Sequence, residues 1–509
     1  MLRRSSIAII AAVLGGSVVA QGNPETITKI IEEGKTRNQT RSHLETMTEQ
    51  IGHRLTSSSS LERGQAWAME QFKSFGCVNV HLEKWGEWPV GFDRAKDGHV
   101  GRMTAPYARD FQFTTSSWTP GTNGLKKGGV IMEPTTLEEV TKNASAYRGK
   151  WMIMNPTPPP SGGGNRGGGA GAAGGTRGTG GGGAAGAAAN SQSGTQQPDL
   201  RTQIREAAVK AGILGTVSGS RNELVLTGGQ YNITWDKLPK GTRITVRKSD
   251  YDAVVKEMKD NKKVELQFDL KQAFRKGPIA NNNVVAEIPG TEKPEEVVIV
   301  SGHFDSWDGP GSQGALDNGT GSSVTLEAAR ILMASGAKPK RTIRFILWSG
   351  EEQGLFGSRG YVQQHMKEMD KISACLVDDG GSNYWGGFVG LETQRSYFQS
   401  SIDVLNEAFK DLPMVFRAQE TMPRGGGSDH ASFNAVGVPG FFTIETGVSD
   451  YTYVHHTQHD KLEAAINAYL VQSSTAAAVT SYNLACADAM LPRGPVPPAP
   501  GGSGRGGGR

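Results

Sequence analysis

From residue 285 onward, short apolar runs rich in β-branched and aromatic residues alternate with segments of helical periodicity. The apolar runs fall at residues 297–300, 343–348, 374–377 and 440–444. Helices are predicted over Thr320–Ala334, which carries apolar residues on one face, and over residues 462–485. Buried strands that alternate with helices form largely parallel sheets covered on both faces. We therefore predict an α/β fold here, a three-layer sandwich around a mixed, mostly parallel central sheet.

The chain is too long for this sheet alone. At 509 residues it exceeds what one hydrophobic core normally accommodates, so two or three domains are expected. Residues 23–75 have helical spacing and residues 78–116 are rich in strand patterns. We assign residues 21–119 to a helical leader and the first strands of the main domain, which resumes over residues 271–490.

The intervening residues 120–270 have a different rhythm. Their predicted elements are short strands at 129–132, 151–154 and 243–246 and one helix at 199–211. This mixture predicts a small α+β domain inserted into the main one.

Two segments are too rich in Gly and Pro to build a core. Gly accounts for 69 of the 509 residues, and many glycines fall in residues 156–198 and 491–509. Such segments bury too little apolar surface to offset the entropy lost on ordering. We predict a disordered surface loop at 156–198 and a disordered tail at 491–509.

The first 20 residues resemble a signal peptide. Arg3 and Arg4 precede an apolar run at residues 7–19, and small residues at the end of that run offer a cleavage site. The run is shorter than the roughly 20 residues that a membrane-spanning helix needs. A secreted or periplasmic protein is therefore predicted, with an uncleaved membrane anchor as the alternative.

Charge and cysteine content narrow the function further. A net charge of +4 is small for this length, and no dense basic run suggests a nucleic-acid partner. Cys77, Cys375 and Cys486 do not cluster, so a thiolate metal site is not expected. We expect all three cysteines to be small buried hydrophobic residues. One disulfide bond between two of them is the alternative.

Polar clusters stand where the predicted strands and helices begin or end. They lie at residues 302–306, 315–319, 349–354, 377–380 and 455–460. Their histidines and carboxylates form a nitrogen and oxygen donor set of the kind that zinc accepts. Two histidines with three carboxylates can hold two zinc ions in open sites if one carboxylate bridges them. The sequence therefore predicts a hydrolytic two-metal site.

Adjacent carboxylates suggest a division of roles. Glu352 can bind metal, while Glu351 can act as the general base on the attacking water. The two glutamates follow a buried-looking strand, which makes a solvated surface pair a poorer interpretation. Asp305, two residues after His303, suits a role in orienting the histidine ring, with a turn cap as the alternative.

These motifs in combination resemble the co-catalytic dizinc aminopeptidase and carboxypeptidase family of metallopeptidases. Residues 302–306, 317–319, 349–354 and 456–460 carry the resemblance, and residues 51–55 and 303–308 are similar to its carboxypeptidase members. The similarity extends over about residues 25–485. It implies the zinc exopeptidase fold and a protease-associated-type identity for the inserted domain.

The resemblance also assigns the site. It makes Asp317 the metal bridge, with His303 and Asp379 on one zinc, Glu352 and His456 on the other, and Glu351 as the base. Asp378 competes with Asp379 and His455 with His456, and the family spacing favours the second of each pair. His430, in residues 427–430, matches a segment near the substrate, where an ordinary loop histidine is the alternative.

The predicted function is a secreted metallo-exopeptidase with two zinc ions that cleaves dipeptides or short peptides. The alternatives are an aminopeptidase on longer peptides and a receptor-like ectodomain without catalysis. A structural single-zinc site is disfavoured because such sites prefer thiolates. We expect peptide substrates and no nucleic-acid partner. We expect no membrane contact after the signal peptide is removed. A homodimer is considered as the assembly.

Overall fold

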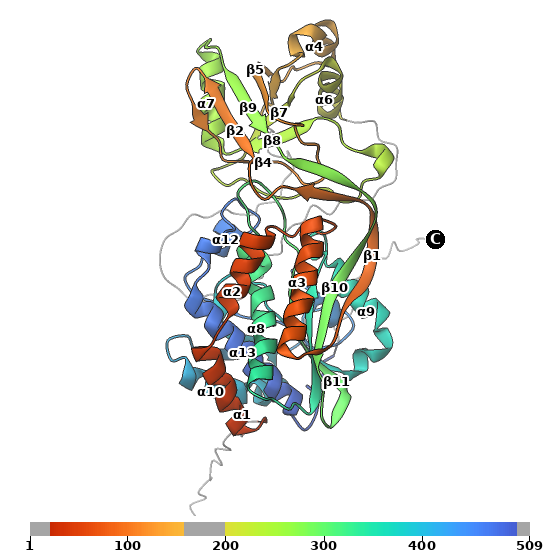
Figure 1. The fold of residues 1–509 in the computed structure, drawn as a ribbon, viewed down its shortest axis with the longest axis vertical. Helices are drawn as coiled ribbons and strands as arrows, with labels where there is room; N and C mark the ends of the chain where they lie inside the picture. The colour runs from red at the N-terminus through yellow and green to blue at the C-terminus, as the bar shows by residue number, and fades with distance from the viewer. Residues whose placement is uncertain (1–20, 157–198, 496–509) are drawn as a thin grey trace, which may run out of the picture.

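The computed structural model describes residues 21–156 and 199–495 of the chain. The predicted signal peptide, nearly all of the Gly/Pro-rich loop and most of the C-terminal tail lie outside the described residues. Figure 1 shows two parts, one above the other, joined by the long strands β1 and β10.

A six-stranded mixed sheet forms the centre of the larger part. Its strand order is β1 (Val78–Arg94), β10 (Gln272–Ile288), β12 (Arg341–Trp348), β11 (Lys293–His303), β13 (Ile372–Val377) and β17 (Gly440–Phe442). The first three strands pair antiparallel, and the last four pair parallel. The predicted mixed, mostly parallel sheet is therefore confirmed.

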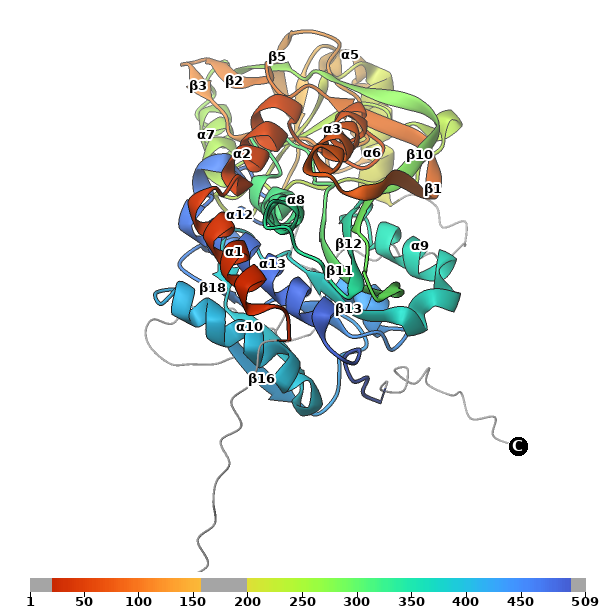
Figure 2. The same ribbon diagram turned by 60° about the horizontal axis from the view of Figure 1, so that its bottom comes forward.

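Helices cover both faces of this first sheet (Figure 2). One face carries α1 (Pro24–Thr36), α2 (Thr40–Glu45), α3 (Ser59–Phe75), α8 (Thr320–Ala334), α10 (Arg395–Ala408) and α13 (Asn467–Cys486). The other face packs against α9 (Phe356–Gln364) and α11 (His430–Asn434). Successive residues of β11 point to opposite faces, so Val298 joins the first hydrophobic core and Ile299 the second. The three-layer sandwich is confirmed.

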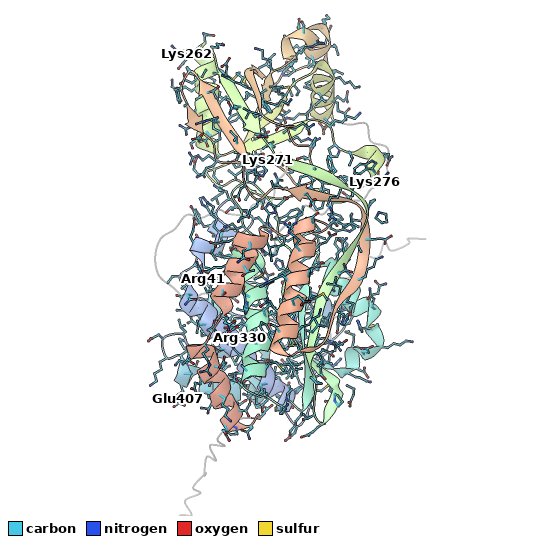
Figure 3. All side chains as sticks on the ribbon, in the orientation of Figure 1. Arg41, Lys262, Lys271, Lys276, Arg330 and Glu407 are labelled. Carbon is cyan, nitrogen blue, oxygen red and sulfur yellow. The ribbon has the colours of Figure 1, made fainter. Side chains whose placement is uncertain are left out.

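Helix ends follow ordinary capping rules. The side chains of Asn23 and Ser58 accept backbone N–H groups at the starts of α1 and α3. Gly76 ends α3 in the left-handed conformation. Arg330 of α8 (labelled in Figure 3) pairs with Glu33 of α1 at 2.7 Å and with Glu327 of its own helix at 2.8 Å.

The last helix is shorter than predicted. It begins at Asn467, and Leu462–Ala464 form a separate 3-10 turn. The backbone N–H of Leu462 donates to the Gln313 side chain at 2.8 Å, and Ile466 is extended. These long-range contacts hold the turn apart from the helix.

A second sheet of eight strands lies beyond the ends of β1 and β10. In spatial order its strands are β3 (Arg109–Asp110), β2 (Val100–Ala105), β9 (Glu265–Asp269), β5 (Lys126–Met132), β6 (Trp151–Ile153), β7 (Gly215–Gly219), β8 (Thr242–Val246) and β4 (Phe113–Thr114). The helices here are α4 (Leu137–Lys142), α5 (Ala144–Tyr147), α6 (Leu200–Ala211) and α7 (Lys248–Lys259). The predicted strands correspond to β5, β6 and β8, and the predicted helix to α6.

This second part has a hydrophobic cluster of its own, with Trp151, Ile244, Leu266 and Phe268 near its centre. Its identity as an inserted protease-associated-type domain stays a prediction. All three cysteines are buried and unpaired, as expected. Among the described residues, no helix has the length and apolar character needed to span a membrane.

Candidate metal centre

Histidines and carboxylates gather at the carboxyl ends of the parallel strands of the first sheet. His303 is the last residue of β11, Glu351 and Glu352 follow β12, and Asp379 follows β13. Asp317 lies in the turn Ala315–Gly319 that leads into α8. His456 follows the short helix α12 (Tyr451–Val454). Loops after parallel strands meet at one edge of a sheet, and five segments distant in sequence thus converge.

His303 stands between three carboxylates. Its Nε2 atom lies 3.0 Å from Asp379 Oδ1, 3.4 Å from Asp317 Oδ1 and 4.0 Å from Glu351 Oε2. Its Nδ1 atom lies 2.9 Å from the backbone carbonyl of Asp305. Because a carbonyl only accepts, Nδ1 donates to it, so the neutral ring would direct its Nε2 lone pair toward a metal.

His456 occupies the equivalent place on the other side of Asp317. Its Nε2 atom lies 2.9 Å from Glu352 Oε2 and 3.2 Å from Asp317 Oδ2. The two oxygens of Asp317 thus face different histidines, Oδ1 toward His303 and Oδ2 toward His456. A carboxylate placed this way can bridge two cations.

The competing neighbours are oriented differently. Asp378 accepts a hydrogen bond from Trp385 Nε1 at 2.9 Å, away from His303. His455 Nε2 lies 3.9 Å from Asp317 Oδ2, farther than His456, although it remains within reach of a shared ion. Asp379 and His456 are the members of the two pairs that lie within 3.0 Å of another proposed ligand, and their assignment stays a prediction.

The side chain of Asp305 does not orient the His303 ring, which is the role that the sequence suggested for it. Its carboxylate lies 3.7 Å from His303 Nδ1, so its backbone carbonyl, not its side chain, orients the ring. The carboxylate instead accepts the Thr56 hydroxyl at 2.8 Å and the backbone N–H groups of Glu351 and Glu352 at 3.3 and 3.4 Å. Asp305 therefore fixes the turn that carries both glutamates.

The site holds more buried negative charge than its histidines can balance. Burial raises the pKa of Glu351 well above its usual range and, with Asp317, raises that of Glu352 to about 7. Burial lowers the pKa of His303, but Asp379 and Glu351 outweigh it and the net shift is well upward. Four carboxylates face two histidines, and a divalent cation would remove this imbalance.

Three contributors were not predicted from the sequence. Buried Arg54 donates to the carbonyls of Phe304 at 2.7 Å and Gly314 at 2.8 Å, and so ties the loop after His303 to the turn before Asp317. The hydroxyl of Thr56 supports Asp305, and the backbone N–H of Trp307 donates to Glu352 Oε1 at 3.0 Å. The family-like segment 51–55 was the one signal that pointed to Arg54.

His430 lies apart from this cluster. Its ring packs 5.5 Å from Phe442, and burial lowers its pKa to about 4, so it is neutral. In the described part of the chain, no hydrogen bond or ion pair joins its side chain to the histidines and carboxylates above.

Comparison with known proteins places the cluster in a region of sequence similarity to peptidases. Residues 283–481 match Peptidase family M28. Carboxypeptidase Q from Homo sapiens is 26% identical over 468 residues, which cover 90% of this chain and 88% of that protein. A probable leucine aminopeptidase from Trichophyton verrucosum (strain HKI 0517) is 30% identical over 213 residues, 40% of this chain and 58% of that protein.

The fold is shared as well. The crystal structure of a peptidase M28 precursor from Shewanella amazonensis SB2B matches with a TM-score of 0.61 at 20% identity, covering 93% of this chain and 99% of that chain. The prediction of a metallo-exopeptidase, and the family resemblance behind it, are confirmed. Residues 283–481 resemble peptidase family M28, the similarity to carboxypeptidase Q extends over 90% of the chain, and the chain is a metallo-exopeptidase.

Proposed function

We propose that the chain is a two-zinc exopeptidase that hydrolyses dipeptides or short peptides. The proposed ligands are His303, Asp317, Glu352, Asp379 and His456. The observation that carries the proposal is the placement of Asp317, whose two carboxylate oxygens face His303 at 3.4 Å and His456 at 3.2 Å.

The residues fit zinc on chemical grounds. Imidazole nitrogen and carboxylate oxygen are its usual ligands in open, catalytic sites. His303 keeps its Nδ1 on the carbonyl of Asp305, so loss of the Nε2 proton would offer that nitrogen to a metal. When bound, two zinc ions would lower the pKa of a shared water and polarise the substrate carbonyl.

Glu351 is the proposed general base. It is next to a proposed ligand yet is not one itself, and only 10% of its side chain is exposed. Asp305 holds its backbone through the hydrogen bond from the Glu351 N–H. Glu351 takes a proton from the attacking water and delivers it to the leaving amine.

The relatives support two substrate patterns. Similarity to carboxypeptidase Q spans 90% of the chain and favours dipeptides or a free carboxyl terminus. The leucine aminopeptidase relative covers 40% and keeps the aminopeptidase alternative open. A panel of free dipeptides, amino-blocked dipeptides and longer peptides separates them. Cleavage of free dipeptides alone identifies a dipeptidase, cleavage of amino-blocked substrates a carboxypeptidase, and stepwise removal of amino-terminal residues an aminopeptidase.

Location and assembly complete the proposal. The signal-peptide pattern over residues 1–20 supports export to a secreted or periplasmic location. A homodimer is the proposed assembly, and sedimentation or light scattering of the purified protein measures it. Residues 120–270, together with the strands β2, β3 and β4 that join their sheet, are proposed to be the inserted protease-associated-type domain.

A further inference from the structure

We propose that residues 223–227, which belong to the second part of the molecule, position His456, and that they act through the side chain of Gln458. The inference rests on the proposed role of His456 as a metal ligand. It assigns to the second sheet a direct part in assembling the metal centre of the first.

The backbone of His456 needs external support. Its φ angle is +56°, in the left-handed region that only a few per cent of residues other than Gly adopt. Such conformations persist where the surrounding structure fixes them. The preceding helix α12 has only four residues. A small change of backbone angle would carry Nε2 away from Glu352 and Asp317.

Residues 223–227 supply part of that support through backbone pairing. The N–H of Thr227 donates to the carbonyl of His456 at 2.8 Å. Leu226 forms an isolated antiparallel bridge with Thr457. The carbonyl of the proposed ligand is thus held by a segment more than 200 residues earlier in the chain.

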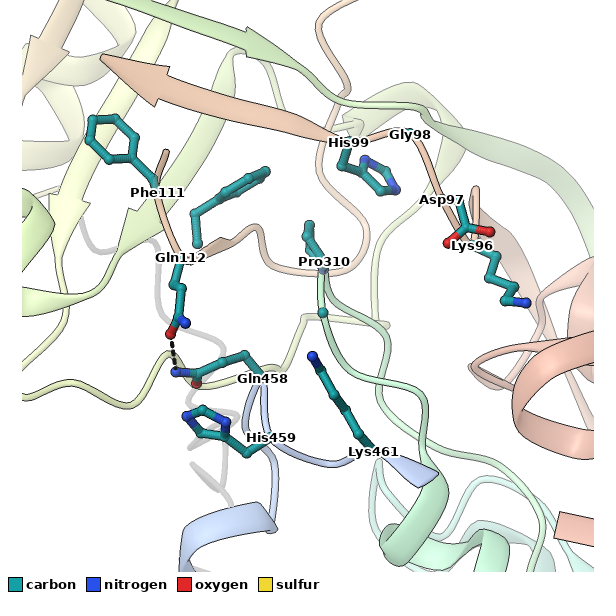
Figure 4. A pocket seen from close by; sticks show the side chains of 12 residues that line it. Lys96, Asp97, Gly98, His99, Phe111, Gln112, Pro310, Gln458, His459 and Lys461 are labelled. Atoms are coloured by element: carbon teal, nitrogen blue, oxygen red, sulfur yellow. Dashed lines mark hydrogen bonds between the residues drawn. The ribbon is translucent and has the colours of Figure 1, made fainter. Parts of the chain in front are cut away.

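Gln458 fastens the same two segments with its side chain. Its Oε1 atom accepts the N–H of Val225 at 2.7 Å, and its Nε2 atom donates to the carbonyl of Glu223 at 3.0 Å. Nε2 also lies 3.1 Å from Gln112 Oε1, the contact drawn in Figure 4. Gln458 is 6% exposed, so removing its amide would leave buried groups without partners.

The residue that directly follows this segment, Gly228, is anchored as well. The N–H of Ser117 donates to the carbonyl of Gly228 at 2.8 Å. The Ser117 hydroxyl donates to Asp308, which pairs with buried Arg94 at 3.2 Å. Asp308 lies in the loop that follows His303. Residues 223–227 are therefore fixed to both halves of the metal centre and can hold His456 at a set distance from Asp317.

A positioning role and a general packing role predict different results. Loss of packing lowers the stability of the protein and weakens the binding of both zinc ions alike. Loss of positioning weakens only the ion shared by His456 and Glu352, because the contacts of His303 and Asp379 lie on other loops. The readout is therefore the zinc affinity of each site, measured by chelator competition on the full-length protein.

The main variant is Gln458→Leu, which keeps the approximate size of the side chain but removes the three hydrogen bonds that the Gln458 side chain makes. We expect the affinity for one of the two zinc ions to fall about tenfold, while the other stays unchanged. Gln458→Glu keeps an acceptor for Val225 and should weaken the same ion less. Arg221→Ala is the control: this exposed residue lies outside residues 223–227, so both affinities should be unchanged.

His456→Ala, measured in parallel, separates this inference from the proposed function. If His456→Ala retains both ions, the ligand assignment is wrong and the inference falls with it. If His456→Ala loses an ion but Gln458→Leu binds both as the parent does, or weakens both equally, only the positioning role is overturned. Should Gln458→Leu not fold, Gln458→Glu carries the test, and unchanged affinity in that variant overturns the role.

Discussion

His303 Nε2 lies 3.0 Å from Asp379 Oδ1, while the adjacent Asp378 turns its carboxylate to Trp385. Two neighbouring residues of identical chemistry thus face different surroundings, one the metal centre and one the helical layer. The difference arises because β13 ends at Val377 and the chain then leaves the sheet.

The two aspartates are expected to respond differently to the same change. Asp379→Asn should lower the affinity for one zinc ion about 10- to 100-fold, because an amide replaces a charged ligand. Asp378→Asn should keep both ions, because the amide oxygen still accepts from Trp385. Zinc content after dialysis against a chelator checks this. A reversed pattern would show that Asp378 is the ligand.

Glu351→Gln should retain zinc but lose most turnover. The amide fills the same space but cannot take a proton from water, and general-base catalysis is typically worth about 10²–10⁴ in rate. Turnover of a dipeptide substrate, with zinc content measured on the same sample, is the test. Activity equal to that of the parent protein would refute the assignment of the base.

Asp317→Ala should lower the affinity of the protein for both zinc ions. Since its two oxygens face His303 and His456 separately, removing the carboxylate takes a ligand from each proposed site. Calorimetric titration with zinc should then show lower affinity in both phases. Glu352→Ala serves as the comparison, because it should affect one phase. Two tightly bound zinc ions per chain in Asp317→Ala would argue against the bridge.

Arg94→Ala should destabilise the junction between the two parts. Arg94 and Asp308 form an ion pair with side chains that are 0% and 1% exposed. Removing one member leaves an uncompensated buried charge, which costs about 3–5 kcal/mol of unfolding free energy. Denaturant unfolding measures the loss. Lys262→Ala, at an exposed position of the second part, should change stability by less than about 0.5 kcal/mol.

The parallel part of the first sheet was predictable because its strands are buried on both faces. Runs such as residues 297–300 and 345–348 are apolar throughout, as strands buried on both faces of a sheet are. The long strand β10 was not predicted, since Asn281, Asn282 and Asn283 interrupt its apolar pattern. Asn283 is buried and donates to the carbonyl of Gly357, a contact that no local pattern reveals.

In the candidate site, too, some features could be predicted from the sequence and others could not. The candidate ligands could be picked out from the sequence because they follow strands or precede helices, and their role stays a prediction. The support from Arg54 and Thr56 could not, because it joins residues about 250 positions apart. The choice between the two oxygens of Asp305, carbonyl and carboxylate, likewise depends on three-dimensional distances alone.

The strands β1 and β10 pair along their whole length, and Arg94 and Gln272, at their ends, are direct partners. The polypeptide thus leaves the first sheet and returns to it at adjacent positions, as it would at the tip of an ordinary hairpin. A gene segment of any length could be added or removed at such a tip without shifting the neighbouring strands. Replacing residues 95–271 by a two-residue turn is therefore the natural way to make a minimal enzyme, although Arg94 would lose its hydrogen bonds to Thr115 and the His456 loop would lose residues 223–227.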